Sequence, residues 1–185
     1  MQSVSHIFGG EAKVKIMRLF IFNPGSIFTS LEVANRSKER PGTARKELRI
    51  LSKAGLIKRR AKGYTLDPSY SYLGPIENFL IDVNPMTGKE IVRKVSRAGN
   101  MKLILTSGVF LHDREARVDI LVVGDHISQA KLLSIMSSIE AELGKELRYA
   151  AFETTDFQYR FSIYDKLIRD ILESQHEKIL NKLGV

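Results

Sequence analysis

The chain has 185 residues, of which 43% are apolar and 27% are charged, and it contains no cysteine. This composition is that of a folded protein, and the lack of cysteine excludes disulfide bonds, a thiolate zinc site and a cysteine nucleophile. The apolar runs are far shorter than the roughly 18 residues of a membrane span, and the N-terminus lacks the basic and apolar regions of a signal peptide. We therefore expect a cytoplasmic protein that does not contact a membrane.

The net charge of +8 is concentrated in the first third of the chain. Residues 1–67 contain 14 Lys and Arg against 5 Asp and Glu, whereas residues 68–185 contain 15 against 16. This asymmetry indicates that one part of the chain binds a polyanion, although basic residues also serve solubility alone.

Three helices and a hairpin are predicted in residues 11–66. The apolar spacing predicts a first helix over residues 11–22, preceded by Gly10 and ended by Pro24. The β-prone residues 27–29 precede a second helix over residues 30–37, for which Ser30 is the expected cap. A third helix begins at Pro41, runs through residues 42–54 and ends at Gly55.

The third helix has a basic outward face. Its apolar stripe consists of Ala44, Leu48 and Leu51, and only Glu47 is expected to oppose the outward cations. The outward positions are Thr43, Arg45, Lys46, Arg49 and Lys53. Two short strands follow around a tip at residues 61–63, where Gly63 can supply a positive φ angle. This hairpin carries Lys58, Arg59, Arg60 and Lys62.

The order of these elements resembles a winged helix-turn-helix domain over residues 7–67: a helix, a short strand, a helix, a turn, a helix and a basic hairpin. The most specific string is RKELRILSKAGLIKRRAKGYTLD, residues 45–67. The resemblance implies that the third helix enters the major groove of double-stranded DNA and that the hairpin contacts the backbone or minor groove. The alternative is that the fold binds protein and that the cations form a solvated face.

The remaining two thirds of the chain mix helices and strands. Residues 68–73 are expected to form an extended connector, followed by helices over residues 74–83 and 89–98. Strands are predicted at 101–106, 117–123 and 147–152, with an amphipathic helix over 128–143 that ends at Gly144. Residues 162–173 and 176–183 have helical periodicity. The pattern predicts an α/β or α+β domain.

The segments VDILVVG (118–124) and LGKELRYAAFE (143–153) resemble the small nucleotidyltransferase domain of the polymerase-β type. The tail from residue 156 resembles the C-terminal region of prokaryotic proteins that join a winged helix to such a domain. The resemblance implies an α+β chain with three parts: a winged helix-turn-helix domain (1–67), a connector with helices (68–94), and a nucleotidyltransferase-like domain with a mixed sheet and C-terminal helices (95–185).

The catalytic motifs of that family are damaged here. Nucleotidyl transfer in the family uses a Gly-Ser turn and two aspartates, two residues apart, that hold Mg²⁺. Asp119 matches the second aspartate, but Arg117 occupies the first position, where a permanent cation opposes a metal ion. The Gly-Ser pair is absent, although Ser107 and Gly108 lie nearby in reversed order. We expect a domain without catalysis, metal or cofactor, in which Asp119 pairs with Arg117 or caps a turn.

These observations predict a prokaryotic transcriptional regulator that binds double-stranded DNA as a homodimer. Its second domain is expected to serve dimerisation or to bind a protein partner or ligand. Two alternatives remain open. One is an active nucleotidyltransferase whose displaced metal site uses Asp113, Glu115 and Asp119, against which Arg117 argues. The other is an antitoxin-like protein that neutralises a toxin partner.

Overall fold

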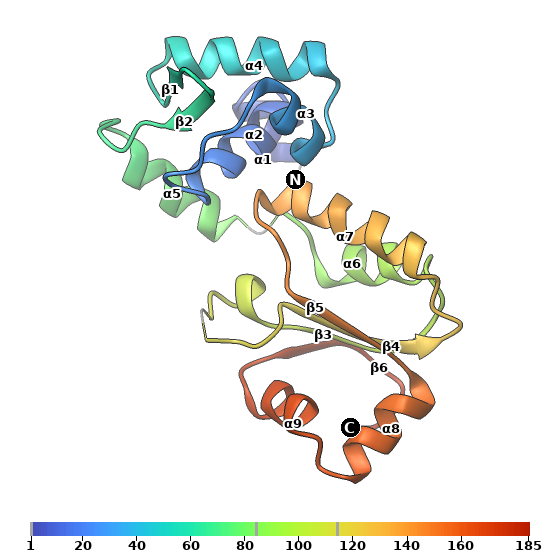
Figure 1. The fold of residues 1–185 in the computed structure, drawn as a ribbon. Coiled ribbons are helices and arrows are strands. Elements are labelled where there is room, and N and C mark those ends of the chain that lie inside the picture. Colours follow the sequence, from blue (N-terminus) through green and yellow to red (C-terminus); the bar gives the residue numbers. More distant parts are fainter. Residues whose placement is uncertain (1, 84, 114) are drawn as a thin grey trace. The chain divides into compact units, whose positions relative to one another are not determined.

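A computed structural model describes residues 2–83, 85–113 and 115–185, which form an α+β fold (Figure 1). The chain divides into two compact units. The first consists of residues 1–86 and 137–146, and the second of residues 87–136 and 147–185. Within the described ranges, no helix combines the length and the apolar character that crossing a membrane requires.

The two units divide the chain differently from the three parts expected from the sequence, which were residues 1–67, 68–94 and 95–185. The segment 68–94 is shared between both units, since the division falls between Met86 and Thr87. Residues 137–146, from the middle of the second expected domain, belong to the first unit.

The first unit is mainly helical and carries one hairpin. Its elements are α1 (Gln2–Ile7), α2 (Glu11–Ile21), α3 (Ser30–Ser37), α4 (Pro41–Lys53), β1 (Ile57–Arg60), β2 (Gly63–Leu66) and α5 (Leu73–Asp82). The three predicted helices and the hairpin are confirmed to within about one residue, whereas α1 was not predicted. The β-prone residues 27–29 contribute a single bridge, between Phe28 and Tyr64.

The N-cap of α3 is Thr29, so the prediction of Ser30 as the cap is wrong. Thr29 is extended, with φ −67° and ψ 160°, and its hydroxyl accepts a hydrogen bond from the backbone N–H of Glu32. The Glu32 carboxylate in turn accepts one from the backbone N–H of Thr29 at 2.7 Å. This reciprocal capping box satisfies two N–H groups at once, which a cap at Ser30 would not achieve with Glu32.

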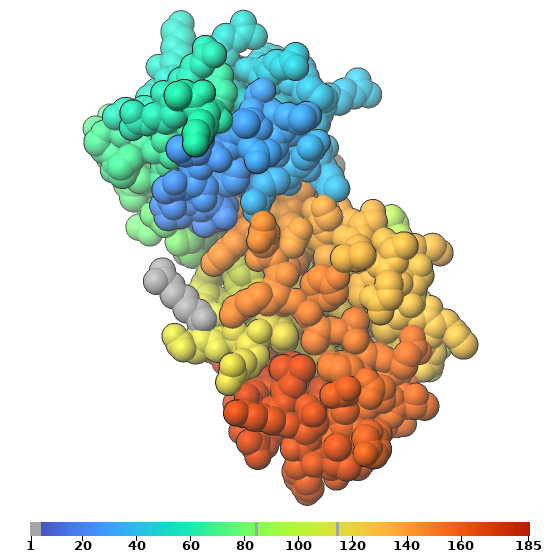
Figure 2. All heavy atoms as spheres, in the orientation of Figure 1, coloured from blue at the N-terminus to red at the C-terminus, as the bar shows by residue number. Residues whose placement is uncertain are grey.

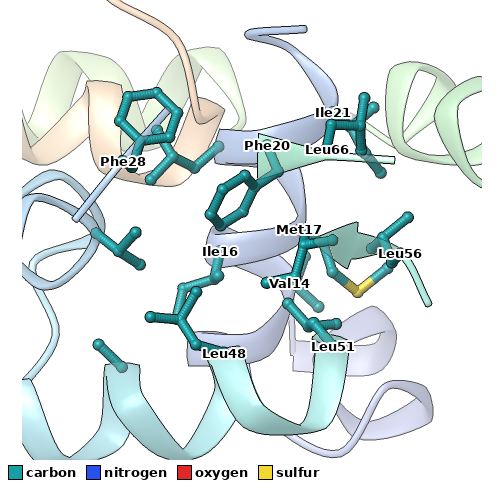
Figure 3. Close-up of a cluster of buried hydrophobic side chains, with 14 of the residues drawn as sticks. Val14, Ile16, Met17, Phe20, Ile21, Phe28, Leu48, Leu51, Leu56 and Leu66 are labelled. Carbon is teal, nitrogen blue, oxygen red and sulfur yellow. The ribbon is translucent and has the colours of Figure 1, made fainter. Parts of the chain in front are cut away.

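The core of the first unit surrounds α2, which is buried along most of its length. Figure 3 shows Val14, Met17 and Phe20 of α2 packed with side chains from α4 and the hairpin. From α4, Leu48 and Leu51 are 0% and 4% exposed. Because these residues hold one side of α4 against α2, the other side of α4 faces solvent.

Residues 137–146 complete the first unit through polar contacts with α2 and its neighbours. Lys15 lies 3.1 Å from Glu142 and 3.5 Å from Glu39, and the side chain of Asn23 donates to the carbonyl of Gly144 at 2.7 Å. Burial acts to lower the pKa of Lys15, but the nearby glutamates outweigh it and raise the pKa. The first unit is therefore assembled from two distant parts of the sequence.

The second unit contains a four-stranded mixed sheet in the order β5-β4-β3-β6. Its elements are α6 (Gly88–Val95), β3 (Asn100–Thr106), a 3₁₀ turn (Gly108–Phe110), β4 (Ile120–Asp125), the first part of α7 (Gln129–Leu143), β5 (Tyr149–Glu153), α8 (Thr154–Ser162), α9 (Lys166–Glu173) and β6 (Glu177–Asn181). Strands β4 and β5 are parallel, and the other two pairs are antiparallel.

The sheet lies between two helical layers. On one face, Leu103 and Leu121 pack with Phe157 of α8 and with Ile168 and Ile171 of α9. Figure 1 shows α6 and the N-terminal part of α7 on the other face. The predicted mixed sheet is thus confirmed.

One prediction in the C-terminal segment is wrong. The helix expected over 176–183 is absent, because Glu177–Asn181 form β6 and pair with β3 from Leu103 opposite Asn181 to Thr106 opposite Glu177. The helix predicted over 162–173 is confirmed as α9, which begins four residues later, at Lys166, whereas α8 over residues 154–162 was not predicted. The spacing of apolar residues in 176–183 is compatible with a helix and with a strand. The segment forms a strand because the edge of β3 offers backbone groups for hydrogen bonding.

Candidate nucleic-acid interface

The one anion of α4, Glu47, lies on the inner face of the helix and is shielded from solvent. Ala44 and Leu48 are fully buried, and Glu47, on the same face, is 7% exposed. Its Oε2 lies 3.7 Å from Nζ of Lys13 on α2. The prediction that Glu47 opposes the outward cations is therefore wrong, because positions 44, 47, 48 and 51 share one side of a helix.

The outer face of α4 is basic, as predicted. Arg45, Lys46, Arg49 and Lys53 are exposed, and Thr43 is half-buried. Sequence reasoning missed Ile50, which is 39% exposed and lies on the same face as Lys46 and Lys53. It could have been found, because it falls outside the stripe of Ala44, Leu48 and Leu51. An exposed aliphatic group on such a face can contact a thymine methyl group.

The hairpin is anchored to the chain that precedes α3. Tyr64 donates its N–H to the carbonyl of Phe28 at 2.8 Å, and Phe28 donates to the carbonyl of Tyr64 at 2.9 Å. Gly63 has φ +151°, and a Cβ there would overlap the Phe28 carbonyl. The predicted positive φ at Gly63 is confirmed, and the close approach explains why a side chain is excluded.

One hairpin cation already has an anionic partner. Nζ of Lys58 lies 2.8 Å from the carboxylate of Asp67, which also accepts hydrogen bonds from Ser69. The hydrogen bond from Lys58, followed by those from Ser69, lowers the pKa of Asp67 to about 2. Lys58 is therefore less available to an external anion than the prediction assumed.

The other cations of α4 and the hairpin differ from Lys58 in this respect. Seven exposed cations form no ion pair with any residue that the structure describes: Arg45, Lys46, Arg49, Lys53, Arg59, Arg60 and Lys62. We call this set the basic face. Figure 2 shows the atoms of α4 (cyan) and of the hairpin (teal to green) adjoining each other on the surface of the first unit. Unbalanced cations on adjacent elements create the positive potential that attracts a polyanion.

In the second unit, Asp119 is occupied by structural contacts. It is 3% exposed, and its carboxylate accepts hydrogen bonds from the backbone N–H groups of Val109 at 2.9 Å and Arg148 at 2.8 Å. The guanidinium of Arg148 adds a contact of 3.3 Å. A side chain at Gly108 would overlap the same carboxylate. Asp119 therefore fastens the 3₁₀ turn to the start of β5.

Arg117 faces a different partner, so the prediction that it pairs with Asp119 is wrong. Its Nε lies 3.4 Å from the carboxylate of Asp170 on α9, and its side chain is 62% exposed. Strand β4 begins only at Ile120, so the two residues do not alternate along that strand. Neither Arg148 nor Asp170 was singled out from the sequence, because both partners are distant along the chain.

Asp113 and Glu115, the acidic residues expected to form a displaced metal site with Asp119, contact each other. The carboxylate of Asp113 accepts a hydrogen bond from the backbone N–H of Glu115 at 2.9 Å. Among the residues that the structure describes, no three His, Asp or Glu side chains gather in a way that could hold a metal ion.

No family model, curated protein or solved structure matches this chain. The function is therefore inferred from charge, exposure and contacts within each unit.

Proposed function

We propose that the first unit is a winged helix-turn-helix domain that binds double-stranded DNA and that the protein regulates transcription. The basic face carries this proposal. Its cations lie on one helix and the adjoining hairpin and pair with no residue in the described part of the chain, while Glu47, the one anion of α4, is turned inward. Such an arrangement leaves the charge available to phosphates, which supply most of the affinity of DNA-binding proteins.

In this proposal α4 reads bases. The helix has 13 residues and is about 20 Å long, and the diameter of an α-helix, about 10–12 Å with side chains, fits the roughly 12 Å width of the major groove. Arg45 and Arg49 lie one turn apart on its exposed side, and a guanidinium can donate two hydrogen bonds to a guanine edge. Ile50 adds an apolar group beside them, suited to a thymine methyl.

The hairpin supplies affinity with little sequence preference. Arg59, Arg60 and Lys62 lie at or near its tip and are exposed. Because the bridge between Phe28 and Tyr64 holds the hairpin against the segment before α3, these cations keep a defined position. Contacts to phosphate from a fixed position orient a protein on DNA without reading its sequence.

The second unit, in the same proposal, is a nucleotidyltransferase-like domain without catalysis. Asp119 supports this proposal, because its carboxylate is already engaged by two backbone N–H groups and a guanidinium. A metal ion at this carboxylate would have to displace the Arg148 guanidinium and compete with two partly buried N–H groups for the carboxylate oxygens, which is costly.

The test is a selection of duplexes from a random pool with the full-length protein, followed by two matched variants. Arg49→Ala should relax the selected sequence at one or two positions, at a cost of about 1–3 kcal/mol for the preferred base. Lys62→Ala should weaken binding to selected and unrelated duplexes by the same factor. If no sequence is enriched, or if both variants change the preference equally, the assigned roles are wrong.

A further inference from the structure

The second unit exposes an unusual concentration of large apolar side chains where α8 meets α9. Five of them lie within nine residues: Tyr159, Phe161, Ile163, Tyr164 and Leu167, exposed by 63%, 46%, 54%, 81% and 38%. We call this set the α8–α9 patch. Elsewhere in the described part of this unit, only Leu133 is a comparably exposed large apolar residue, at 58%. A concentration of exposed apolar surface on this scale is typical of an interaction site.

The patch combines projecting side chains with a hollow. A cavity of about 460 Å³ opens between the two helices, lined by apolar groups from Phe161, Ile168 and Leu172. Its rim carries both signs of charge, with Asp165 and Arg169 among the lining residues. Asp165 lies 3.5 Å from Arg160 and Arg169 lies 4.0 Å from Glu173, so these charges are balanced within the chain. The patch therefore offers aromatic groups that can be inserted and a hollow that can receive them.

Tyr164 occupies a backbone position that an aromatic residue rarely takes. It has φ +55° and follows the C-terminal end of α8. The backbone N–H of Tyr164 donates a hydrogen bond to the carbonyl of Phe161 at 3.2 Å, and the backbone N–H of Asp165 donates one to the carbonyl of Arg160 at 2.9 Å. This is a Schellman motif, in which glycine or asparagine is the favoured residue at the left-handed position. A tyrosine there is unfavourable for the fold, and it is also 81% exposed, so local stability does not explain it.

We propose that two copies of the chain associate through the α8–α9 patch in a two-fold symmetric dimer. A two-fold interface uses the same surface twice, so that surface must complement itself. The patch meets this condition, because it carries both the exposed Tyr164 and a hollow that the partner's Tyr164 can enter. Around the hollow, Asp165 pairs with Arg160 and Arg169 with Glu173, so the rim has no excess charge that would favour a polyanion or a partner of one charge sign.

The exposed area is of the right order. Five large side chains with these exposures present on the order of 500 Å², and each side of a stable interface contributes about 800 Å². The adjoining surface of α9 can supply the rest. The inference extends the proposed function, because a two-fold dimer would present two basic faces to DNA. It is tested without DNA, so failure of one proposal does not affect the other.

The first experiment measures mass and stability. In sedimentation equilibrium, the 185-residue chain should have twice the 20.9 kDa mass of one copy. Tyr164→Gly should raise the dimer dissociation constant about tenfold or more, without lowering the thermal midpoint measured on the monomer, because glycine suits the left-handed position. Leu133→Ala removes a similarly exposed apolar group from α7 and should leave association unchanged. A wild-type chain that stays monomeric overturns the proposal, as does equal weakening by both variants.

The second experiment locates the interface with a thiol, since the chain has no cysteine of its own. Under mild oxidation, Tyr164→Cys should form a disulfide-linked dimer at low protein concentration, and Leu133→Cys should not. Equal cross-linking of both variants would place the contact elsewhere and overturn the proposal. Capture of a second, different protein by a wild-type chain that is itself monomeric would also overturn it.

Discussion

The salt dependence of DNA binding should report how many cations of the basic face contact phosphate. The seven exposed cations of the basic face, which pair with no described residue, are available. If Arg45 and Arg49 contact bases, about five remain for phosphates, and the slope of log K against log salt should be about −4 to −5. Between about 50 and about 200 mM salt, the affinity should then fall by roughly 500-fold.

Single substitutions measure how much each residue contributes to the slope of log K against log salt. Lys62→Met should reduce its magnitude by about 0.9, the value for one phosphate contact. The double variant Lys58→Met with Asp67→Asn should leave the slope unchanged, because these two charges already neutralise each other at 2.8 Å. Lys182→Met is the matched control, since Lys182 is exposed on the second unit and its loss changes the net charge equally.

The assay is fluorescence anisotropy of a labelled duplex that carries the selected sequence, titrated at several salt concentrations and constant pH. A slope near zero would refute the assignment of the basic face to phosphate. Equal reductions in Lys62→Met and Lys182→Met would also refute it, because the slope would then follow net charge and not contacts.

Three further outcomes are expected. Asp67→Asn should be less stable than the wild type near neutral pH, because Lys58 and Ser69 hold the pKa of Asp67 at about 2 and the stabilisation requires the ionised form. The difference in unfolding free energy should disappear as the pH falls from about 4 to about 2, and urea unfolding across this range measures that difference. Gly63→Ala should cost about 1–3 kcal/mol or more of unfolding free energy in the same assay, through its strained φ and the overlap of its Cβ, whereas Gly42→Ala, with open space around it on α4, should be neutral or stabilising. Asp119→Ala should cost about 1–3 kcal/mol of unfolding free energy, because two partly buried backbone N–H groups lose this acceptor. Neither this variant nor the wild type should transfer label from nucleoside triphosphates with Mg²⁺; transfer by the wild type that the variant abolishes would contradict this.

The sequence by itself determined the elements of the first unit that depend on near neighbours. The ends of α2 and α4 follow from Pro24, Pro41 and Gly55, and the hairpin follows from an alternating basic segment with a glycine after its tip. The basic character of α4 was equally evident, because a helix with one apolar stripe places its remaining residues outside. These signals act over a few residues, so a single segment contains all the information that they need.

Contacts between distant segments decided the rest. Helix periodicity already places Glu47 on the buried side of α4, and only the folded chain identifies its partner, Lys13 on another helix. Lys58 likewise pairs with Asp67, which follows the second strand of the hairpin. Asp119 bonds to Arg148 and the 3₁₀ turn and not to Arg117, and residues 177–181 became a strand because β3 offered an unpaired edge. A charged side chain or a short apolar segment can satisfy several partners equally well. Only the folded chain selects one, by bringing that partner within the few ångströms over which ion pairs and hydrogen bonds act.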